Sequence, residues 1–95
     1  MHVVSHKAIW MFCVQHPDAR SALDHWYRVA KRGTWTKFAD VRQSFNAADF
    51  VAPFVGFDIG GNKYRLIAEI SFGRKVLLIR AIMTHKEYER GAWKS

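Results

Sequence analysis

The N-terminal half of the chain carries apolar residues at the spacing of helices. One row repeats at positions i, i+3, i+4 and i+7, as on the core-facing side of a helix. This row consists of Ile9, Phe12, Cys13 and His16. Ser5 precedes the row and can cap a first turn, and Pro17 ends it because proline has no backbone N–H to donate. A helix is therefore predicted between Ser5 and Pro17.

A second helix is predicted to begin at Pro17, because a first helical turn does not need that N–H. Asp18 suits the positive end of the helix dipole, and Gly33 follows Lys31 and Arg32 as a C-terminal cap. The buried row is Ala19, Ala22, Leu23, Trp26 and Val29 or Ala30. A shorter helical segment is predicted over 37–45, with Phe38, Val41 and Phe45 facing inward.

In the C-terminal half the pattern is that of strands. Apolar residues alternate or run together over 54–59, 63–72 and 75–83, and a short β-branched piece occupies 2–4. Gly60-Gly61-Asn62 and Gly73-Arg74 supply turn residues between the three strands, whereas 46–53 reads as a connector. Three antiparallel strands with helices on one face predict an α+β fold in a single domain of residues 1–95.

Side chains on the strand over 63–72 divide by face, because strands alternate with period two. The uniformly apolar set is expected to face the helices. It comprises Tyr64, Leu66, Ala68, Ile70 and Phe72. Lys63 and Arg65 then lie on the open face, about 7 Å apart. Arg80 interrupts the apolar row of the next strand, so it either snorkels at an edge or is placed for function.

A short C-terminal helix is predicted from Thr84. Thr84 and Glu87 fit a capping box, which puts His85 in the first turn and Tyr88 on the same face. A helix N-terminus and nearby cations disfavour imidazolium, so His85 is expected to be neutral near pH 7 and able to accept a proton. The alternative for a single histidine is a solvated cap residue.

Charge narrows the range of partners. The 95 residues carry a formal net charge of +7, and the sequence pI is near 10, which favours polyanions such as nucleic acid over a merely solubilising role. A membrane-surface role is weaker, since no predicted helix joins a wide apolar face to a lysine-rich one. Cys13 is the only cysteine, so no internal disulfide or cysteine-based zinc site is expected. No signal peptide or membrane span is predicted, and the expected compartment is the cytoplasm.

The glycine pair at 60–61 does not indicate a nucleotide-binding loop. It lacks the spacing of a phosphate-binding or dinucleotide motif and joins strand to strand, so a hairpin turn is preferred. Ordinary solvated cations remain the alternative for Lys63, Arg65 and Arg80 taken singly.

Several short motifs, in register over nearly the whole chain, resemble the HigB-type toxins of bacterial toxin–antitoxin pairs, which have the RelE-like fold. The motifs are His16-Pro17-Asp18-Ala19, Trp26-Tyr27-Arg28, Thr34-Trp35 through Phe38-Ala39-Asp40, the run 60–67, and Thr84-His85 with Tyr88. The resemblance implies a messenger RNA endonuclease that in many cases acts on the translating ribosome. It also implies a helix-turn-helix antitoxin of the HigA type that represses the shared operon, so that operator DNA is reached only through the antitoxin complex.

The same resemblance assigns an RNA-cleaving face to Lys63, Arg65, Arg80, His85 and Tyr88. Asn62 and Lys86, their neighbours in sequence, are added as RNA-binding candidates. No cluster of carboxylates is evident in the sequence, so metal-dependent cleavage is disfavoured and no cofactor is expected. The alternative function is a basic RNA- or ribosome-binding protein that acts by occupancy, with His85 and Tyr88 merely structural.

Overall fold

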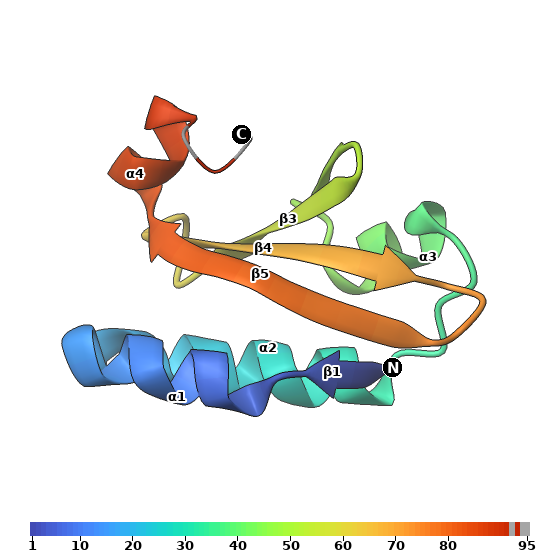
Figure 1. The fold of residues 1–95 in the computed structure, drawn as a ribbon, viewed down its shortest axis with the longest axis horizontal. Coiled ribbons are helices and arrows are strands. Elements are labelled where there is room, and N and C mark those ends of the chain that lie inside the picture. The colour runs from blue at the N-terminus through green and yellow to red at the C-terminus, as the bar shows by residue number, and fades with distance from the viewer. Residues whose placement is uncertain (92, 94–95) are drawn as a thin grey trace.

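A five-stranded sheet lies at the centre of the computed structural model, which describes residues 1–91 and 93 (Figure 1). The strand order is β1-β5-β4-β3-β2. The strands are β1 (His2–Val4), β2 (Asp49–Val51), β3 (Phe54–Ile59), β4 (Tyr64–Ser71) and β5 (Val76–Thr84). The three predicted strands form the antiparallel centre, β3-β4-β5.

The sheet is larger than predicted, and it is mixed. β1 pairs with β5 in parallel, and β2 adds an antiparallel edge from the segment that reads as a connector. The expectation of a purely antiparallel, three-stranded sheet is therefore wrong. Both added strands have three residues, too few for an alternating pattern to stand out, and the apolar pattern of β1 does not encode its direction.

The helices are divided between the two faces of the sheet. α1 (His6–Gln15) and α2 (Arg20–Arg32) cover one face, and α4 (His85–Arg90) stands over the other (Figure 1). Pro17–Ala19 form a 3₁₀ turn before α2, and α3 (Phe38–Ser44) follows α2. The predicted α+β layering and short C-terminal helix are confirmed. No helix within the described residues is long and apolar enough to cross a membrane.

Two predicted caps differ in detail. Ser5 occupies the N-cap position of α1, but its side chain makes no capping hydrogen bond. Gly33 occupies the C-cap of α2 at a φ of −59°, so it does not adopt the left-handed conformation. Its lack of a side chain matters for packing instead, because a Cβ there would lie 2.9 Å from the ring of Trp35.

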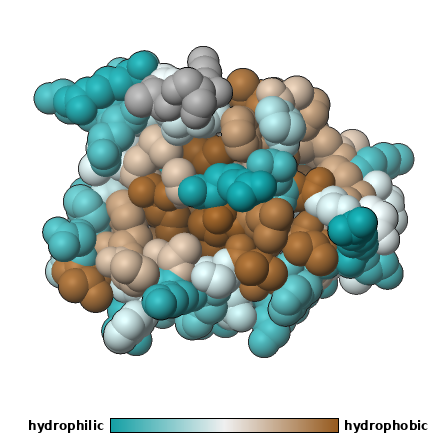
Figure 2. Space-filling view, viewed as in Figure 1, coloured by the Kyte–Doolittle hydropathy of each residue, from teal (hydrophilic) through white to brown (hydrophobic). Residues whose placement is uncertain are grey.

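The core lies between the sheet and the layer of α1 and α2. Phe57, Leu66 and Leu77 from the three central strands are buried with Leu23 and Trp26 of α2. The side chains of β4 that were predicted to face the helices, and Phe72 directly after this strand, all belong to this core or pack against it. Figure 2 shows apolar surface over the middle of the view, where β5 crosses the molecule, with hydrophilic side chains around its margin.

Asp18 ties the helical layer to the start of β4. Its carboxylate accepts a hydrogen bond from the Lys63 ammonium, with which it also forms an ion pair, and a second one of 2.7 Å from the Tyr64 hydroxyl. The hydrogen bond from Lys63, and then that from Tyr64, lowers the pKa of Asp18 below its ordinary value of 3.8. Asp18 was expected to interact with the helix dipole, and in the structure it connects the β3–β4 turn to the helical layer.

Replacing Asp18 by Asn should lower the melting temperature most at neutral pH. Because the pKa of Asp18 is lowered on folding, its stabilising contribution is complete above 3.8 and is lost as pH falls through the folded value. Melting curves of both proteins between about pH 6 and pH 2.5 should therefore converge at the acid end. Asp24→Asn, which removes an exposed carboxylate 3.8 Å from Arg20, is the matched control and should show a smaller gap. If the difference in melting temperature between Asp18→Asn and the wild-type protein does not change with pH, the stabilising role of the Asp18 carboxylate is contradicted.

Candidate functional site

The predicted acid–base pair lies where β5 passes directly into α4. The backbone N–H of His85 donates to the carbonyl of Lys63 at 3.2 Å, so the start of α4 is joined to the end of the β3–β4 turn. In register, Tyr64 pairs with Thr84 and Arg65 with Met83. The β4–β5 pairing therefore brings His85 beside the first residues of β4, as the sequence predicts.

The capping box that starts α4 is present. The Thr84 hydroxyl accepts from the backbone N–H of Glu87 at 3.2 Å, and the Glu87 carboxylate accepts from the backbone N–H of Thr84 at 3.0 Å. These hydrogen bonds with Thr84 lower the pKa of Glu87. Gly91 ends the helix in the left-handed conformation, with φ of 74°. Both ends of this short helix are therefore fixed by local contacts, which orient His85 and Tyr88.

Arg65 lies beneath α4, and it is not the exposed cation that the sequence suggested. It pairs in register with Asp58 on β3, and its Nε lies 2.9 Å from the Asp58 carboxylate. Neither atom has a hydrogen-bond partner of good geometry, so the contact is an ion pair. Asp49 on β2 lies 4.0 Å away, and the Arg65 side chain is only 11% exposed. The Arg65 side chain points to the open face of the sheet, as predicted, but the prediction that it is exposed there is wrong.

Tyr88 covers this arginine. The Arg65 guanidinium carbon lies 4.6 Å from the centre of the Tyr88 ring, within the range of a cation–π contact. The Tyr88 hydroxyl comes close to Gly56, where an added Cβ would lie 3.9 Å from it. The Tyr88 ring is therefore held against the sheet above Arg65, and α4 covers this end of the open face.

Three aromatic rings stack at this end of the sheet. The His85 and Tyr88 rings are 6.3 Å apart with an interplanar angle of 25°, which confirms that they share one face of α4. Trp93 also stacks on Tyr88, with ring centroids 5.0 Å apart, and donates its indole N–H to the Tyr88 carbonyl. The stack presents flat aromatic surface beside a cation, an arrangement that suits a nucleotide base next to its phosphate.

His85 also meets an anion that the sequence argument left out. Its Nε2 lies 2.7 Å from the Glu89 carboxylate, one helical turn further on. Its Nδ1 is buried without a hydrogen-bond partner. Glu89 therefore adds a negative charge to surroundings in which the sequence indicated only cations. A carboxylate in contact with one nitrogen can orient the ring, as in acid–base pairs of enzymes.

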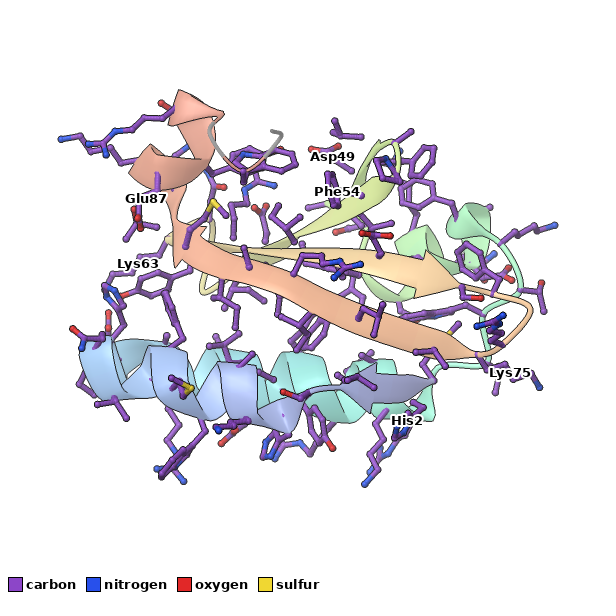
Figure 3. All side chains as sticks on the ribbon, viewed as in Figure 1. His2, Asp49, Phe54, Lys63, Lys75 and Glu87 are labelled. Carbon is purple, nitrogen blue, oxygen red and sulfur yellow. The ribbon has the colours of Figure 1, made fainter. Side chains whose placement is uncertain are left out.

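Lys63 points away from this cluster. It lies in the β3–β4 turn, one residue before β4 begins, so strand alternation does not fix its direction. Its ammonium pairs with Asp18 at the helical layer, at the corner labelled in Figure 3. The expectation that Lys63 and Arg65 form one open-face pair is therefore wrong. Lys63 joins the site through its backbone carbonyl.

Arg80 lies further along the open face. In the β4–β5 ladder Ile67 pairs with Ala81 and Ala68 with Ile79, so Arg80 is the extra residue of a β-bulge. Its Nε donates to the Glu69 carboxylate at 2.7 Å. Glu69 is four strand residues from Arg65, a distance of about 13 Å. Arg80 is therefore separate from the His85 cluster.

The two added RNA-binding candidates are exposed. Asn62 sits in the β3–β4 turn with φ of 73°, and Lys86 lies in the first turn of α4. Neither side chain has an ionic or hydrogen-bonding partner within the described part of the chain. Lys86 is thus a cation available to an incoming anion next to His85.

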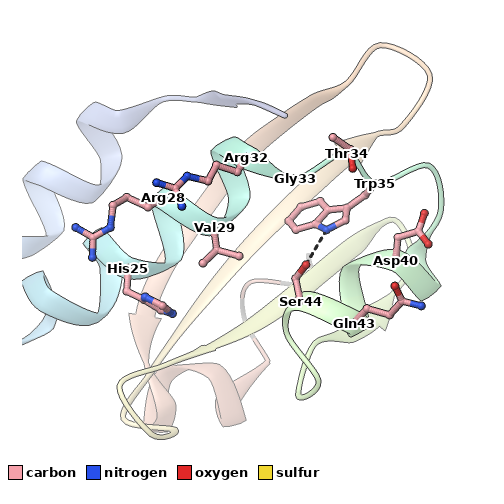
Figure 4. Close-up of a pocket in the computed structure, with 10 residues that line it drawn as sticks. All are labelled: His25, Arg28, Val29, Arg32, Gly33, Thr34, Trp35, Asp40, Gln43 and Ser44. Atoms are coloured by element: carbon pink, nitrogen blue, oxygen red, sulfur yellow. Dashed lines mark hydrogen bonds between the residues drawn. The ribbon is translucent and has the colours of Figure 1, made fainter.

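A wide groove lies elsewhere on the molecule. It has a volume of about 590 Å³ and runs between α2 and α3, with Arg28 and Arg32 on one wall and Trp35 and Ser44, joined by a 3.1 Å hydrogen bond, on the other (Figure 4). It contains none of the predicted site residues. Over residues 1–91 and 93, no group of three or more His, Cys, Asp or Glu is placed to hold a metal ion. We therefore locate the candidate site by its chemistry, at the stack on Arg65.

Comparison with known proteins gives the family. The HigB toxin family, described as the RelE-like toxic component of a toxin–antitoxin system, matches residues 19–91. The chain belongs to the HigB toxin family. It is 27% identical over 92 residues to the mRNA interferase toxin HigB of Escherichia coli K12, an alignment that covers 94% of this chain and 88% of the relative. It is 32% identical over 94 residues to the mRNA interferase HigB of Escherichia coli O6:H1, covering 95% and 90%.

Sequence reasoning missed the acidic partners and one ring of this HigB-family site. Glu89 could have been found, because it lies at i+4 from His85 on a predicted helix. Asp58 could have been found by extending the pairing outward from the glycine turn to Arg65. Nothing in the sequence indicated that Asp49 lies near Arg65, since β2 was not recognised. Nothing indicated the position of Trp93 either, because it lies beyond the helix that positions it.

The Arg65–Asp58 ion pair should contribute measurably to stability. Asp58→Ala leaves the 4.0 Å contact to Asp49 as the one ionic contact of the shielded guanidinium among the described residues, so we expect a loss of about 1–3 kcal/mol in the free energy of unfolding. Glu69→Ala breaks a pair with Arg80, whose side chain is 51% exposed, and should cost less than about 1 kcal/mol. Urea unfolding of the three proteins measures both losses. Equal losses would mean that Arg65 is not shielded as described.

Proposed function

We propose that this HigB-family toxin is a messenger RNA endonuclease that inhibits translation, acting in the cytoplasm and on the ribosome. The observation that carries the proposal is the stack of His85 and Tyr88 over Arg65, which combines a proton-transfer group, a phenol and a fixed cation within one small area. The names of the relatives, which are mRNA interferases, support the same substrate and reaction.

The proposed reaction is attack by a ribose 2′-OH on the adjacent phosphorus. The 2′ oxygen forms a bond to phosphorus while its proton passes to a base, and the bond from phosphorus to the 5′ oxygen breaks as that oxygen takes up a proton. The products are a 2′,3′-cyclic phosphate and a 5′-hydroxyl. Proton transfer by a positioned group contributes typically about 10²- to 10⁴-fold, and fixed charge on the developing anion contributes as much or more.

We assign proton transfer to His85 and charge stabilisation to Arg65. Tyr88 either positions the nucleotide or serves as the second proton-transfer group. Because Arg65 is held by Asp58 and covered by the Tyr88 ring, it acts as a fixed charge and does not grip the phosphate through a mobile side chain. This rigidity suits transition-state stabilisation, because no reorganisation is needed during the reaction.

RNA binding requires Glu89 to leave His85. The Glu89 side chain is 66% exposed, and an exposed contact between such side chains is worth about 1 kcal/mol or less, so its displacement costs little. An approaching phosphate repels the Glu89 carboxylate and is attracted by Lys86 on the next residue. In this scheme Glu89 contacts Nε2 of His85 in the free protein, and bound RNA replaces Glu89 at this nitrogen.

Lys63 and Arg80 are proposed to contact RNA on either side of the cleaved bond. Both are at least half exposed, and each has a partly exposed carboxylate partner, Asp18 or Glu69, that a phosphate can replace. Asn62, in the adjoining turn, is proposed to bind the same strand. The antitoxin is proposed to be a helix-turn-helix protein of the HigA type, through which the complex binds operator DNA.

His85→Ala should abolish most cleavage while leaving the fold and RNA affinity intact. We expect the rate in EDTA to fall at least about a hundredfold, because a proton-transfer group is lost. Gel analysis of an end-labelled messenger RNA, with and without programmed ribosomes, measures the rate and shows whether the fragments end in 2′,3′-cyclic phosphate.

His2→Ala is the matched control for this test, since His2 is exposed in β1 and has no assigned chemistry. If His85→Ala cuts at the wild-type rate, or if EDTA stops the wild-type protein, the proposed mechanism is wrong. If the wild-type protein binds RNA tightly and never cuts it, the occupancy function replaces the enzymatic one.

Lys86→Ala should weaken RNA binding and its dependence on salt. One lost phosphate contact removes roughly one unit from the slope of log affinity against log salt concentration. Arg74→Ala removes the same charge at the opposite end of the β4–β5 hairpin and should leave the slope unchanged. Titrations of a 2′-deoxy-substituted RNA at several salt concentrations give both slopes. Identical slopes for the two variants would remove Lys86 from the RNA-binding surface.

A further inference from the structure

Helix α1 carries large apolar side chains on its outer face. Trp10 is 62% exposed, Met11 57% and Val14 69%, and these are three of the four large exposed apolar side chains in the described part of the chain. The opposite face of the helix is also apolar, because Ile9 is buried and Phe12 packs on the core. A helix that is apolar all round is normally buried all round. Among the described residues, no element therefore covers the outer face of α1.

The exposed side chains form one continuous patch. Trp10 and Val14 are four residues apart and Met11 and Val14 three, so all three share one side of the helix. A shallow cavity of about 210 Å³ extends the patch towards α2 and is lined by Trp10, Cys13, Val14, Pro17 and Arg20. We call Trp10, Met11, Val14 and this cavity the α1 patch. Apolar side chains gathered in this way on a small protein mark an interaction surface.

The rim of the α1 patch is basic. Lys7 lies one turn before Trp10 and Met11 on the same side of α1 and has no ionic partner among residues 1–91 and 93. Arg20 closes the other end, with its side chain 72% exposed and 3.8 Å from Asp24. An apolar centre between two cations is complementary to a partner that offers apolar anchors flanked by carboxylates.

The charges favour a different protein over a second copy of this chain. A two-fold contact between identical patches would bring the Lys7 and Arg20 side chains of both copies into one interface, between two chains that each carry a net charge of +7. Like charges at an interface are unfavourable unless acids are interposed, and Asp24 alone does not balance them. An acidic partner would instead be attracted by Lys7 and Arg20.

We propose that the α1 patch is the docking surface for the antitoxin of this toxin, which inserts the apolar side of an amphipathic helix between Lys7 and Arg20. The proposal rests on membership of the HigB toxin family, because that family acts with an antitoxin. Trp10 is the main anchor, since large aromatic side chains dominate the energetics of such interfaces. The surface lies in the helical layer, on the other side of the sheet from α4 (Figure 1).

Substitutions in the α1 patch test the proposal through binding and growth together. Trp10→Glu and Val14→Glu place a negative charge where acidic flanks are expected and should weaken antitoxin affinity by at least about thirtyfold. Calorimetry with the full-length antitoxin measures affinity, with His85→Ala added to each toxin so that it can be produced. Without that addition, each variant should still arrest growth when expressed alone, which shows that it folds, and should no longer be rescued by co-expressed antitoxin.

Phe50→Glu is the matched control, because Phe50 is 58% exposed on β2, outside the α1 patch. It should keep full antitoxin affinity. Unchanged affinity of Trp10→Glu would overturn the proposal. So would sedimentation showing that this chain alone is a dimer that Trp10→Glu makes monomeric, because the patch would then bind a second copy. If the wild-type chain binds the antitoxin but cuts no RNA, and Trp10→Glu no longer binds the antitoxin, the proposed nuclease function is wrong and the proposed docking surface is supported.

Discussion

The ion pair between Arg65 and Asp58 is the contact on which the site depends. It joins β4 to β3 on the open face, at the point where α4 crosses above the sheet. Tyr88 rests on the arginine, and His85 is placed by its stacking on Tyr88 and by its backbone bond to Lys63. At 11% exposure the Arg65 side chain is shielded from water, and Asp58 and Tyr88 together hold its guanidinium in place.

Charge compensation is the second organising constraint. The chain as a whole carries +7, yet three of the four cations predicted to bind substrate already have carboxylate partners: Lys63 with Asp18, Arg65 with Asp58, and Arg80 with Glu69. His85 is likewise in contact with Glu89. We therefore propose that RNA binding at Lys63, Arg80 and His85 exchanges carboxylates for phosphates. The shielded Arg65 pair is expected to persist, whereas the exposed pairs are weak enough to be exchanged.

The sequence predicted the parts of this protein that follow from periodic patterns and local caps. The helices, the three central strands, the capping box at Thr84 and the shared face of His85 and Tyr88 all depend on neighbours within a turn or a hairpin. The family resemblance was also confirmed. The direction of Lys63 and the edge strands escaped prediction, because a residue in a turn has no alternation to orient it and three-residue strands give too little pattern. The pairing of Arg65 with Asp49 required β2, so it could not be foreseen either.

The most direct test of the central claim is to observe which residues an RNA contacts. An oligonucleotide with a 2′-deoxyribose at the cleavage position cannot react, so its complex can be followed by NMR. The account predicts that the largest shifts occur at Arg65, His85 and Tyr88, together with loss of the His85–Glu89 contact. Shifts confined to the groove between α2 and α3, with the signals of His85 and Arg65 unmoved, would contradict it.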